Sequence, residues 1–250
     1  MIKFLQIVLI ALIAFTLNSC AMQTNVVKSM EDAKKSVLKI ETWARLGQCN
    51  EKTMSCGEYE MMSMGTGAII LYKNSRAVLT AAHVCKQDDF EKFIEINNGH
   101  FYLKAIDREG KEYILERIKH NNKQDICLLE SVSGPIGDGQ YLKLSVKKPE
   151  YGEHVYNIAG PLGIIEGEMV PLMHGQFFGE QDGHAFYSIP AIGGSSGSPV
   201  LNIKGELIGM IHSVHYRFHH ITLSATHTQL WNFLAHVRNH TLQFQNSSQH

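Results

Sequence analysis

The sequence predicts an all-β protein, built from two six-stranded antiparallel β-barrels and closed by a C-terminal helix. Short apolar and β-branched runs recur from about residue 36 onward, and turn residues separate them. These runs form two groups of about six, and a glycine-containing stretch at residues 131–139 lies between the groups. Chains with many short, turn-bounded strands commonly fold as sandwiches or barrels, and we expect one barrel from each group.

The first barrel is expected over about residues 36–132 and the second over about residues 140–226. A helix should follow at about residues 227–240, before a polar tail at residues 241–250. The apolar runs of the first group, of which about six should form the first barrel, are Val37–Thr42, Gly65–Tyr72, Ala77–Ala82, Phe93–Asn97, Phe101–Ile106, Tyr113–Lys119 and Ile126–Glu130. Those expected in the second barrel are His154–Ala159, Glu168–Phe178, Ala185–Pro190, Pro199–Asn202, Glu206–Val214 and Ile221–Ala225.

The expected C-terminal helix has a start signal and an apolar face. Thr226 or Thr228 can cap it, because a threonine hydroxyl accepts a hydrogen bond from a free amide of the first turn. Leu230, Trp231 and Phe233 recur at helical spacing. We therefore expect this helix to pack on the last barrel.

The first 20 residues carry the pattern of a signal peptide. Lys3 precedes a mostly apolar run, Phe4–Leu17, which is 14 residues long. That run is shorter than the roughly 18 residues that suggest a membrane-spanning helix, and it fits the core of a secretory signal. The run closes with Leu-Asn-Ser-Cys at residues 17–20, which resembles the lipobox of bacterial lipoproteins. We expect export to the bacterial cell envelope, a lipid anchor on Cys20 and a tether at residues 21–35. Ordinary cleavage and an uncleaved anchor are the alternatives.

Charge and composition exclude several classes of partner. The chain has 23 Lys and Arg against 24 Asp and Glu, a formal charge of −1, so the basic excess of a nucleic-acid-binding protein is missing. The 14 histidines do not join cysteines or carboxylates in a recognisable ligand pattern, and we expect no metal site. We expect no organic cofactor either.

The strongest local pattern is the run Gly193–Val200, which reads Gly-Gly-Ser-Ser-Gly-Ser-Pro-Val. Glycines before and after Ser196 permit a sharp turn that exposes the serine hydroxyl. They also allow the amides of Gly194 and Ser196 to point into one pocket, as an oxyanion hole requires. A plain turn between strands is the alternative.

A serine hydroxyl is a weak nucleophile at neutral pH, so it needs a base and the base needs an orienting group. His83 stands at the end of an apolar run, with two alanines before it that leave room for a neighbour. Asp125 enters the apolar run Ile126–Leu129, whereas the other candidate aspartates lie in polar stretches. We therefore expect Ser196 as nucleophile, His83 as base and Asp125 as the orienting carboxylate.

Four stretches resemble the conserved blocks of the chymotrypsin-like serine proteases, and they stand in that family's order. They are Gly65–Ile70, Leu79–His83, Asp125–Leu129 and Gly194–Val200. Their spacing is similar to that of the compact bacterial branch that includes glutamyl endopeptidases and high-temperature-requirement proteases. The resemblance covers about residues 36–240, and it implies two barrels with the triad in the cleft between them. Vertebrate digestive members carry an aspartate before the nucleophile that pairs with a new N-terminus, but this sequence has Ser195, so such activation is not expected.

The resemblance also suggests where the primary specificity pocket lies. One wall should begin at Pro190 and continue through Ala191 and Ile192, and the absence of a carboxylate there argues against a preference for Lys or Arg. The other wall should include His212 and Val214. His212 lies one residue from the position where glutamyl endopeptidases carry an acid-reading histidine, and a shift of one residue reverses the face of a strand. A structural or solvated role for His212 therefore stays open.

The cysteines other than Cys20 form an even set, which suits an exported protein. Cys49 and Cys56 would close a short polar loop. Cys85 and Cys127 each lie two residues beyond a member of the expected triad, so they should also meet. Buried free thiols are the alternative for these four cysteines.

These observations predict an exported serine endopeptidase that cleaves protein or peptide substrates through an acyl-enzyme. The alternative is a surface lipoprotein that keeps the protease fold as a binding module without turnover.

Overall fold

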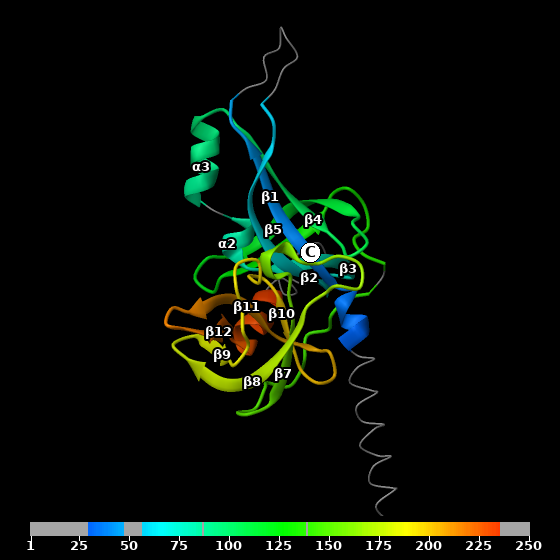
Figure 1. Cartoon of the computed structure of the whole chain (residues 1–250), viewed down its shortest axis with the longest axis vertical. Helices are drawn as coiled ribbons and strands as arrows, with labels where there is room; N and C mark the ends of the chain where they lie inside the picture. Colours follow the sequence, from blue (N-terminus) through cyan, green and yellow to red (C-terminus); the bar gives the residue numbers. More distant parts are fainter. Residues whose placement is uncertain (1–29, 48–56, 87, 139, 236–250) are drawn as a thin grey trace, which may run out of the picture.

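A computed structural model describes residues 30–47, 57–86, 88–138 and 140–235, and it confirms the predicted fold class (Figure 1). The strands form two closed barrels, with the orders β1-β2-β3-β6-β5-β4 and β10-β11-β12-β9-β8-β7. Every pairing between neighbouring strands is antiparallel. In Figure 1 the first barrel lies above the second.

The strands occur close to the predicted positions. In the first barrel they are β1 (Val37–Arg45), β2 (Glu60–Tyr72), β3 (Ser75–Thr80), β4 (His100–Ile106), β5 (Glu112–Asn121) and β6 (Ile126–Ser131). In the second they are β7 (His154–Ile158), β8 (Leu172–Gln181), β9 (His184–Tyr187), β10 (Pro199–Leu201), β11 (Leu207–His215) and β12 (Phe218–Ala225). A 3₁₀ turn, η1 (Pro161–Gly163), follows β7.

The strand expected at Phe93–Asn97 is wrong, because these residues belong to helix α3 (Asp88–Ile96) and the turn after it. Three acidic residues stand in the first turn of α3, where they favour a helix N-terminus. Phe90 and Ile94, four residues apart, lie on one face: Ile94 is buried, and Phe90 packs edge-on against Phe101 of β4. The run at residues 93–97 is only five residues long, which is too short to distinguish the helical spacing of apolar residues from the alternation of a strand.

The C-terminal helix is described over residues 227–235, and the rest of its expected range lies outside the described residues. Thr226 caps it in a reciprocal arrangement: the Gln229 amide donates to Thr226 Oγ1 at 3.2 Å, and Gln229 Oε1 accepts from the Thr226 amide at 2.8 Å. Leu230 and Phe233 are buried in the core cluster that the two barrels share, so the helix contacts more than the last barrel alone.

The folded part begins before residue 36, where the tether was expected to end. Residues 30–34 are helical, and Met30 and Ala33 are buried in the core cluster of the first barrel. Cys20 and the rest of the expected signal and tether lie outside the described residues. Among the residues that the structure describes, no helix is long and apolar enough to cross a membrane.

A single apolar core joins the two barrels. Ile158, Leu201 and Leu207 of the second barrel belong to the same buried cluster as the interior of the first barrel. A smaller cluster around Tyr187 fills the rest of the second barrel. The continuous core fixes one barrel against the other, which is necessary if residues from both are to form one site.

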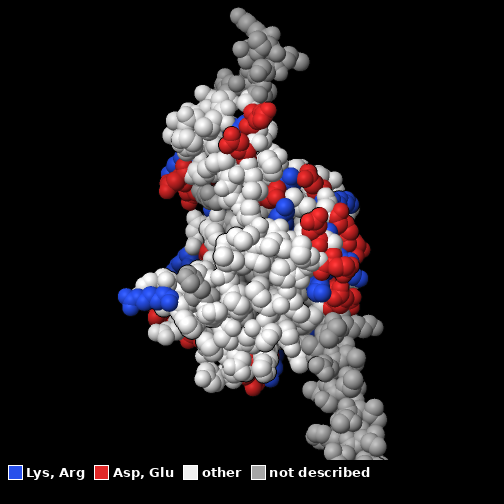
Figure 2. Space-filling view, in the orientation of Figure 1, with Lys and Arg blue, Asp and Glu red and all other residues white. Residues whose placement is uncertain are grey.

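Charged side chains are unevenly distributed on the visible face. In Figure 2, acidic and basic side chains lie mixed along the right-hand side, and the centre of the face carries few charges. Several charged side chains of the protein form ion pairs, for example Lys104 with Glu112 at 2.7 Å and Lys39 with Glu41 at 2.8 Å. This face therefore has no continuous basic patch.

Cys85 and Cys127 form a disulfide, which confirms their predicted pairing. Cys85 ends helix α2 (Ala82–Cys85), and Cys127 is the second residue of β6. Cys49 and Cys56 lie outside the described residues. The disulfide closes a segment that contains β4 and β5, and it lies beside His83 and Asp125.

Replacing both Cys85 and Cys127 with alanine should lower the free energy of unfolding by about 2–4 kcal/mol, because the unfolded chain would lose a cross-link across a 42-residue separation. Urea unfolding of the oxidised wild type, the reduced wild type and the double variant would measure this. The reduced wild type keeps both sulfur atoms and so controls for lost packing. Equal stability of the oxidised and reduced wild type would contradict the prediction.

Candidate active site

Ser196 lies on the loop that connects β9 to β10, and this loop lies directly against the first barrel. The Thr66 amide of β2 donates to the Ser196 carbonyl at 2.7 Å. Gly197 has a φ of +88°, and a Cβ there would collide with the carbonyl of Thr66 and the hydroxyl of Thr80. Only glycine combines this backbone conformation with such a close approach. The glycine after Ser196 is therefore required by packing between the barrels.

His83 and Asp125 are brought together by the pairing of β3 with β6. Thr80 at the end of β3 lies opposite Cys127 of β6, so the residues just outside these two positions face one another. Asp125 Oδ2 lies 2.7 Å from His83 Nδ1, and Asp125 Oδ1 accepts from the His83 amide at 2.9 Å. Both carboxylate oxygens therefore hold the same histidine, and the ring presents its Nε2 away from Asp125.

The electrostatics of Asp125 suit a carboxylate that must remain ionised. Burial alone would raise its pKa, but the hydrogen bonds and charge of His83 outweigh burial and lower the pKa of Asp125 below its ordinary value. Asp125 also has a φ of +53°, a conformation that aspartate adopts more readily than most residues. The turn before β6 thus directs an ionised carboxylate at His83.

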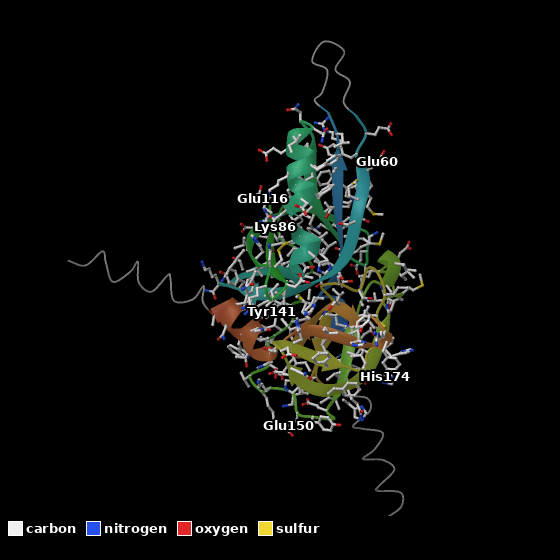
Figure 3. The ribbon with its side chains drawn as sticks, turned by 90° about the vertical axis from the view of Figure 1, so that its left-hand side faces the viewer. Glu60, Lys86, Glu116, Tyr141, Glu150 and His174 are labelled. Carbon is white, nitrogen blue, oxygen red and sulfur yellow. A yellow bond between two sulfur atoms is a disulfide. The ribbon has the colours of Figure 1, made fainter. Side chains whose placement is uncertain are left out.

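The backbone of Ser196 lies close to the helix that carries His83. A Cβ on Gly65 would lie 3.0 Å from the Ser196 carbonyl and 2.7 Å from a methyl group of Val84, which follows His83. Gly65 therefore leaves room for α2 and the serine loop to approach one another. Lys86, the residue that directly follows α2, is labelled in Figure 3. The structure thus brings together the elements that carry Ser196, His83 and Asp125.

The sequence predicts an oxyanion hole from the amides of Gly194 and Ser196, and the bonding of the serine loop leaves both amides unused among the described residues. The Leu162 amide in η1 donates to the Gly193 carbonyl at 2.8 Å. Because a trans peptide directs its C=O and N–H in opposite directions, the Gly194 amide points away from Leu162. Within the described part of the chain, the Gly194 and Ser196 amides donate to no protein group. Both are available to bind an oxygen that becomes negatively charged.

The residues expected around the specificity pocket show different degrees of exposure. Pro190 and Ile192 are exposed, and Ala191 is partly buried. Val214 is partly buried and lies opposite Thr222 of β12. The structure places Ile192 in a tight turn with Ser195, whose amide donates to the Ile192 carbonyl at 3.0 Å.

His212 lies at a break in the pairing of β11 with β12, where the register shifts between Ile211 and Ser213. Its ring is buried, with Nε2 3.3 Å from His184 Nδ1 and Nδ1 3.0 Å from Ser213 Oγ. The same Nδ1 is 3.9 Å from Asp125 Oδ2. Both ring nitrogens have partners within the protein, which favours the structural role over contact with a substrate. The sequence did not reveal that His184 joins this group, because bulges and side-chain directions have no simple sequence signal.

No metal-binding arrangement occurs in the part of the chain that the structure describes: no three His, Cys, Asp or Glu side chains are grouped as a metal ion would require.

A model of the trypsin-like peptidase domain matches residues 65–210, which is more than half of the chain. The chain belongs to the trypsin-like peptidase family. The matched segment of this family member contains His83, Asp125 and Ser196. No curated protein gave a significant sequence match. The bacterial branch within the family stays a prediction.

The buried His212 should make this trypsin-like domain lose stability in mild acid. Burial lowers the pKa of His212 to about 4, although Asp125 opposes this effect. The histidine of the unfolded chain has a pKa of about 6.5, so below that pH it binds a proton in the unfolded state but not in the folded state. The free energy of unfolding therefore falls as the pH decreases, until the pH reaches about 4. The expected loss is on the order of 3 kcal/mol. Asp125 should contribute mainly at lower pH.

Urea unfolding at several pH values between 7 and 4.5 would measure the effect of His212. The His212→Gln variant should show a flatter dependence of stability on pH than the wild type. His154→Gln is a matched control, because the His154 side chain is exposed. Equal losses in the wild type and His212→Gln over this range would contradict the prediction.

Proposed function

We propose that this trypsin-like peptidase-family protein is a serine endopeptidase that hydrolyses peptide bonds of protein substrates. The observation that carries the proposal is that both carboxylate oxygens of Asp125 are hydrogen-bonded to His83. The Ser196 loop also packs against the helix that contains His83. A binding module would not need an ionised, two-point support for a histidine. A Ser-His-Asp mechanism needs that support.

Each group has a defined task in the proposed reaction. His83 Nε2 takes the proton of Ser196 Oγ as this oxygen attacks the scissile carbonyl carbon, and Asp125 stabilises the imidazolium that results. The amides of Gly194 and Ser196 bind the oxyanion of the tetrahedral intermediate. His83 then gives its proton to the leaving amine, and the acyl-enzyme forms. Water, deprotonated by His83, releases the acyl group and restores Ser196.

We also propose that Pro190, Ala191, Ile192 and Val214 line the pocket for the side chain that precedes the scissile bond. This proposal draws support from the position of Ile192, which is bonded to Ser195 within the serine loop. No carboxylate occurs at residues 190–192, so a cationic substrate side chain would lack a counter-charge there.

Replacing Ser196 with alanine should lower the hydrolysis of fluorescently labelled casein by at least about 10⁴-fold and leave the fold intact, because the nucleophile alone is removed. His83→Ala should abolish labelling by a fluorophosphonate probe, as should Ser196→Ala. Mass spectrometry of the labelled wild type should locate the probe on Ser196.

Ser75→Ala serves as the matched control, because Ser75 lies exposed at the start of β3 and should label normally. A folded wild type that neither labels nor cleaves would refute the proposal. That result would instead support the binding-module function.

We further propose that the protein is exported and anchored by lipid on Cys20. The described structure begins at residue 30, so the ten Cα–Cα steps from Cys20 to Met30 could span at most about 36 Å. An anchored protease would then act on substrates close to the membrane.

Replacing Cys20 with serine should move the protein from the membrane fraction to the soluble fraction and abolish incorporation of a labelled fatty acid, because serine offers no thiol for the lipid. Detection in a bacterial host, by fractionation and by metabolic labelling, would measure both effects. A Ser19→Ala variant, which keeps the thiol, is the control. Membrane association that persists without Cys20 would favour an uncleaved anchor.

A further inference from the structure

Thr66 of β2 lies at the junction of the two barrels, and its side chain is fully buried. Every polar group of this residue has a partner. The amide donates to the Ser196 carbonyl at 2.7 Å, and the carbonyl accepts from Thr80 Oγ1 at 2.7 Å. The hydroxyl donates to the Gly194 carbonyl at 2.7 Å and accepts from the Gly160 amide at 3.0 Å.

These partners include the carbonyls of Gly194 and Ser196, the two residues whose amides form the proposed oxyanion hole. Thr66 therefore fixes the peptide that follows Gly194 and the peptide that follows Ser196. Gly194 has a φ of +92° and no side chain, so its flanking peptides would otherwise rotate at little cost. The hydroxyl of Thr66 restricts that rotation from the first barrel.

The same hydroxyl links the serine loop to a second support. Gly160, which donates to Thr66 Oγ1, is followed by η1, and the Leu162 amide of η1 holds the Gly193 carbonyl at 2.8 Å. The peptide before Gly194 is thus held by η1, and the peptide after it is held by Thr66. Together these bonds determine the direction of the Gly194 amide.

We propose that Thr66 is a positioning residue, whose hydroxyl holds the Gly194 peptide so that the oxyanion hole is preformed. This inference rests on the proposed serine endopeptidase function. A hydroxyl is required because the group must donate to the Gly194 carbonyl and accept from the Gly160 amide at the same time. Both partners are buried, so water would not readily replace it.

Thr66→Val keeps the branched shape and removes the hydroxyl, whereas Thr66→Ser keeps the hydroxyl and removes the methyl group. With labelled casein, Thr66→Val should lower kcat by about 10²-fold, as expected for a misplaced oxyanion donor. Its KM should change by less than about 3-fold, because the oxyanion hole stabilises the transition state and not the bound substrate. Thr66→Ser should stay within about 5-fold of the wild type in kcat.

Thr222→Val is the matched control for folding, because Thr222 is equally buried and its hydroxyl donates to the Tyr187 carbonyl of β9 at 3.5 Å. Hydrogen exchange gives a readout that does not depend on activity. The peptide segment around residues 188–198 should exchange faster in Thr66→Val than in the wild type or Thr222→Val.

These measurements separate a failure of the role proposed for Thr66 from a failure of the serine endopeptidase function. A folded Thr66→Val variant with wild-type kcat and unchanged exchange would overturn the proposal. Equal impairment of Thr66→Ser and Thr66→Val would also overturn it, because the methyl group would then be the important part. An inactive, unlabelled wild type would refute the serine endopeptidase function and with it the catalytic purpose of Thr66. Faster exchange in Thr66→Val would in that case show only that Thr66 orders the loop.

Discussion

The candidate site depends on the direct contact between the backbone of the serine loop and β2 of the first barrel. Gly197 approaches the Thr66 carbonyl so closely that no side chain fits, and Gly65 leaves the same kind of space beside Ser196 and Val84. Glycines on both sides of the contact let two backbones meet without intervening side chains. The position of Ser196 is therefore set by the first barrel, which also carries His83 and Asp125.

A second constraint is the environment of Asp125, which lies between two histidines with different roles. His83 contributes two hydrogen bonds to the carboxylate and supplies the charge that lowers its pKa. His212 lies 3.9 Å from the same oxygen, but burial keeps its ring neutral at neutral pH. A second cation behind Asp125 would compete with the imidazolium of His83 for the carboxylate. The low pKa of His212 keeps that position uncharged at neutral pH.

The sequence predicted most of the fold, because strand period and turn residues are local signals. It also predicted that His83 and Asp125 meet, because His83 ends one apolar run, Asp125 begins another, and both stand in the order of the serine protease family. It mistook α3 for a strand, because a five-residue apolar run fits either period. It left the direction of His212 open, because a register shift in β11 decides which face the ring occupies.

Thr66 was not singled out from the sequence, although it stands in one of the family-like blocks. Its importance arises from four hydrogen bonds to residues distant in sequence, and no local pattern encodes such a set. In the digestive relatives that the sequence resembles, an aspartate before the nucleophile pairs with a new N-terminus. Here Ser195 is buried and its amide bonds to the Ile192 carbonyl within its own turn. The bonds from Thr66 and Leu162 to the carbonyls of Gly193, Gly194 and Ser196 hold the loop from outside.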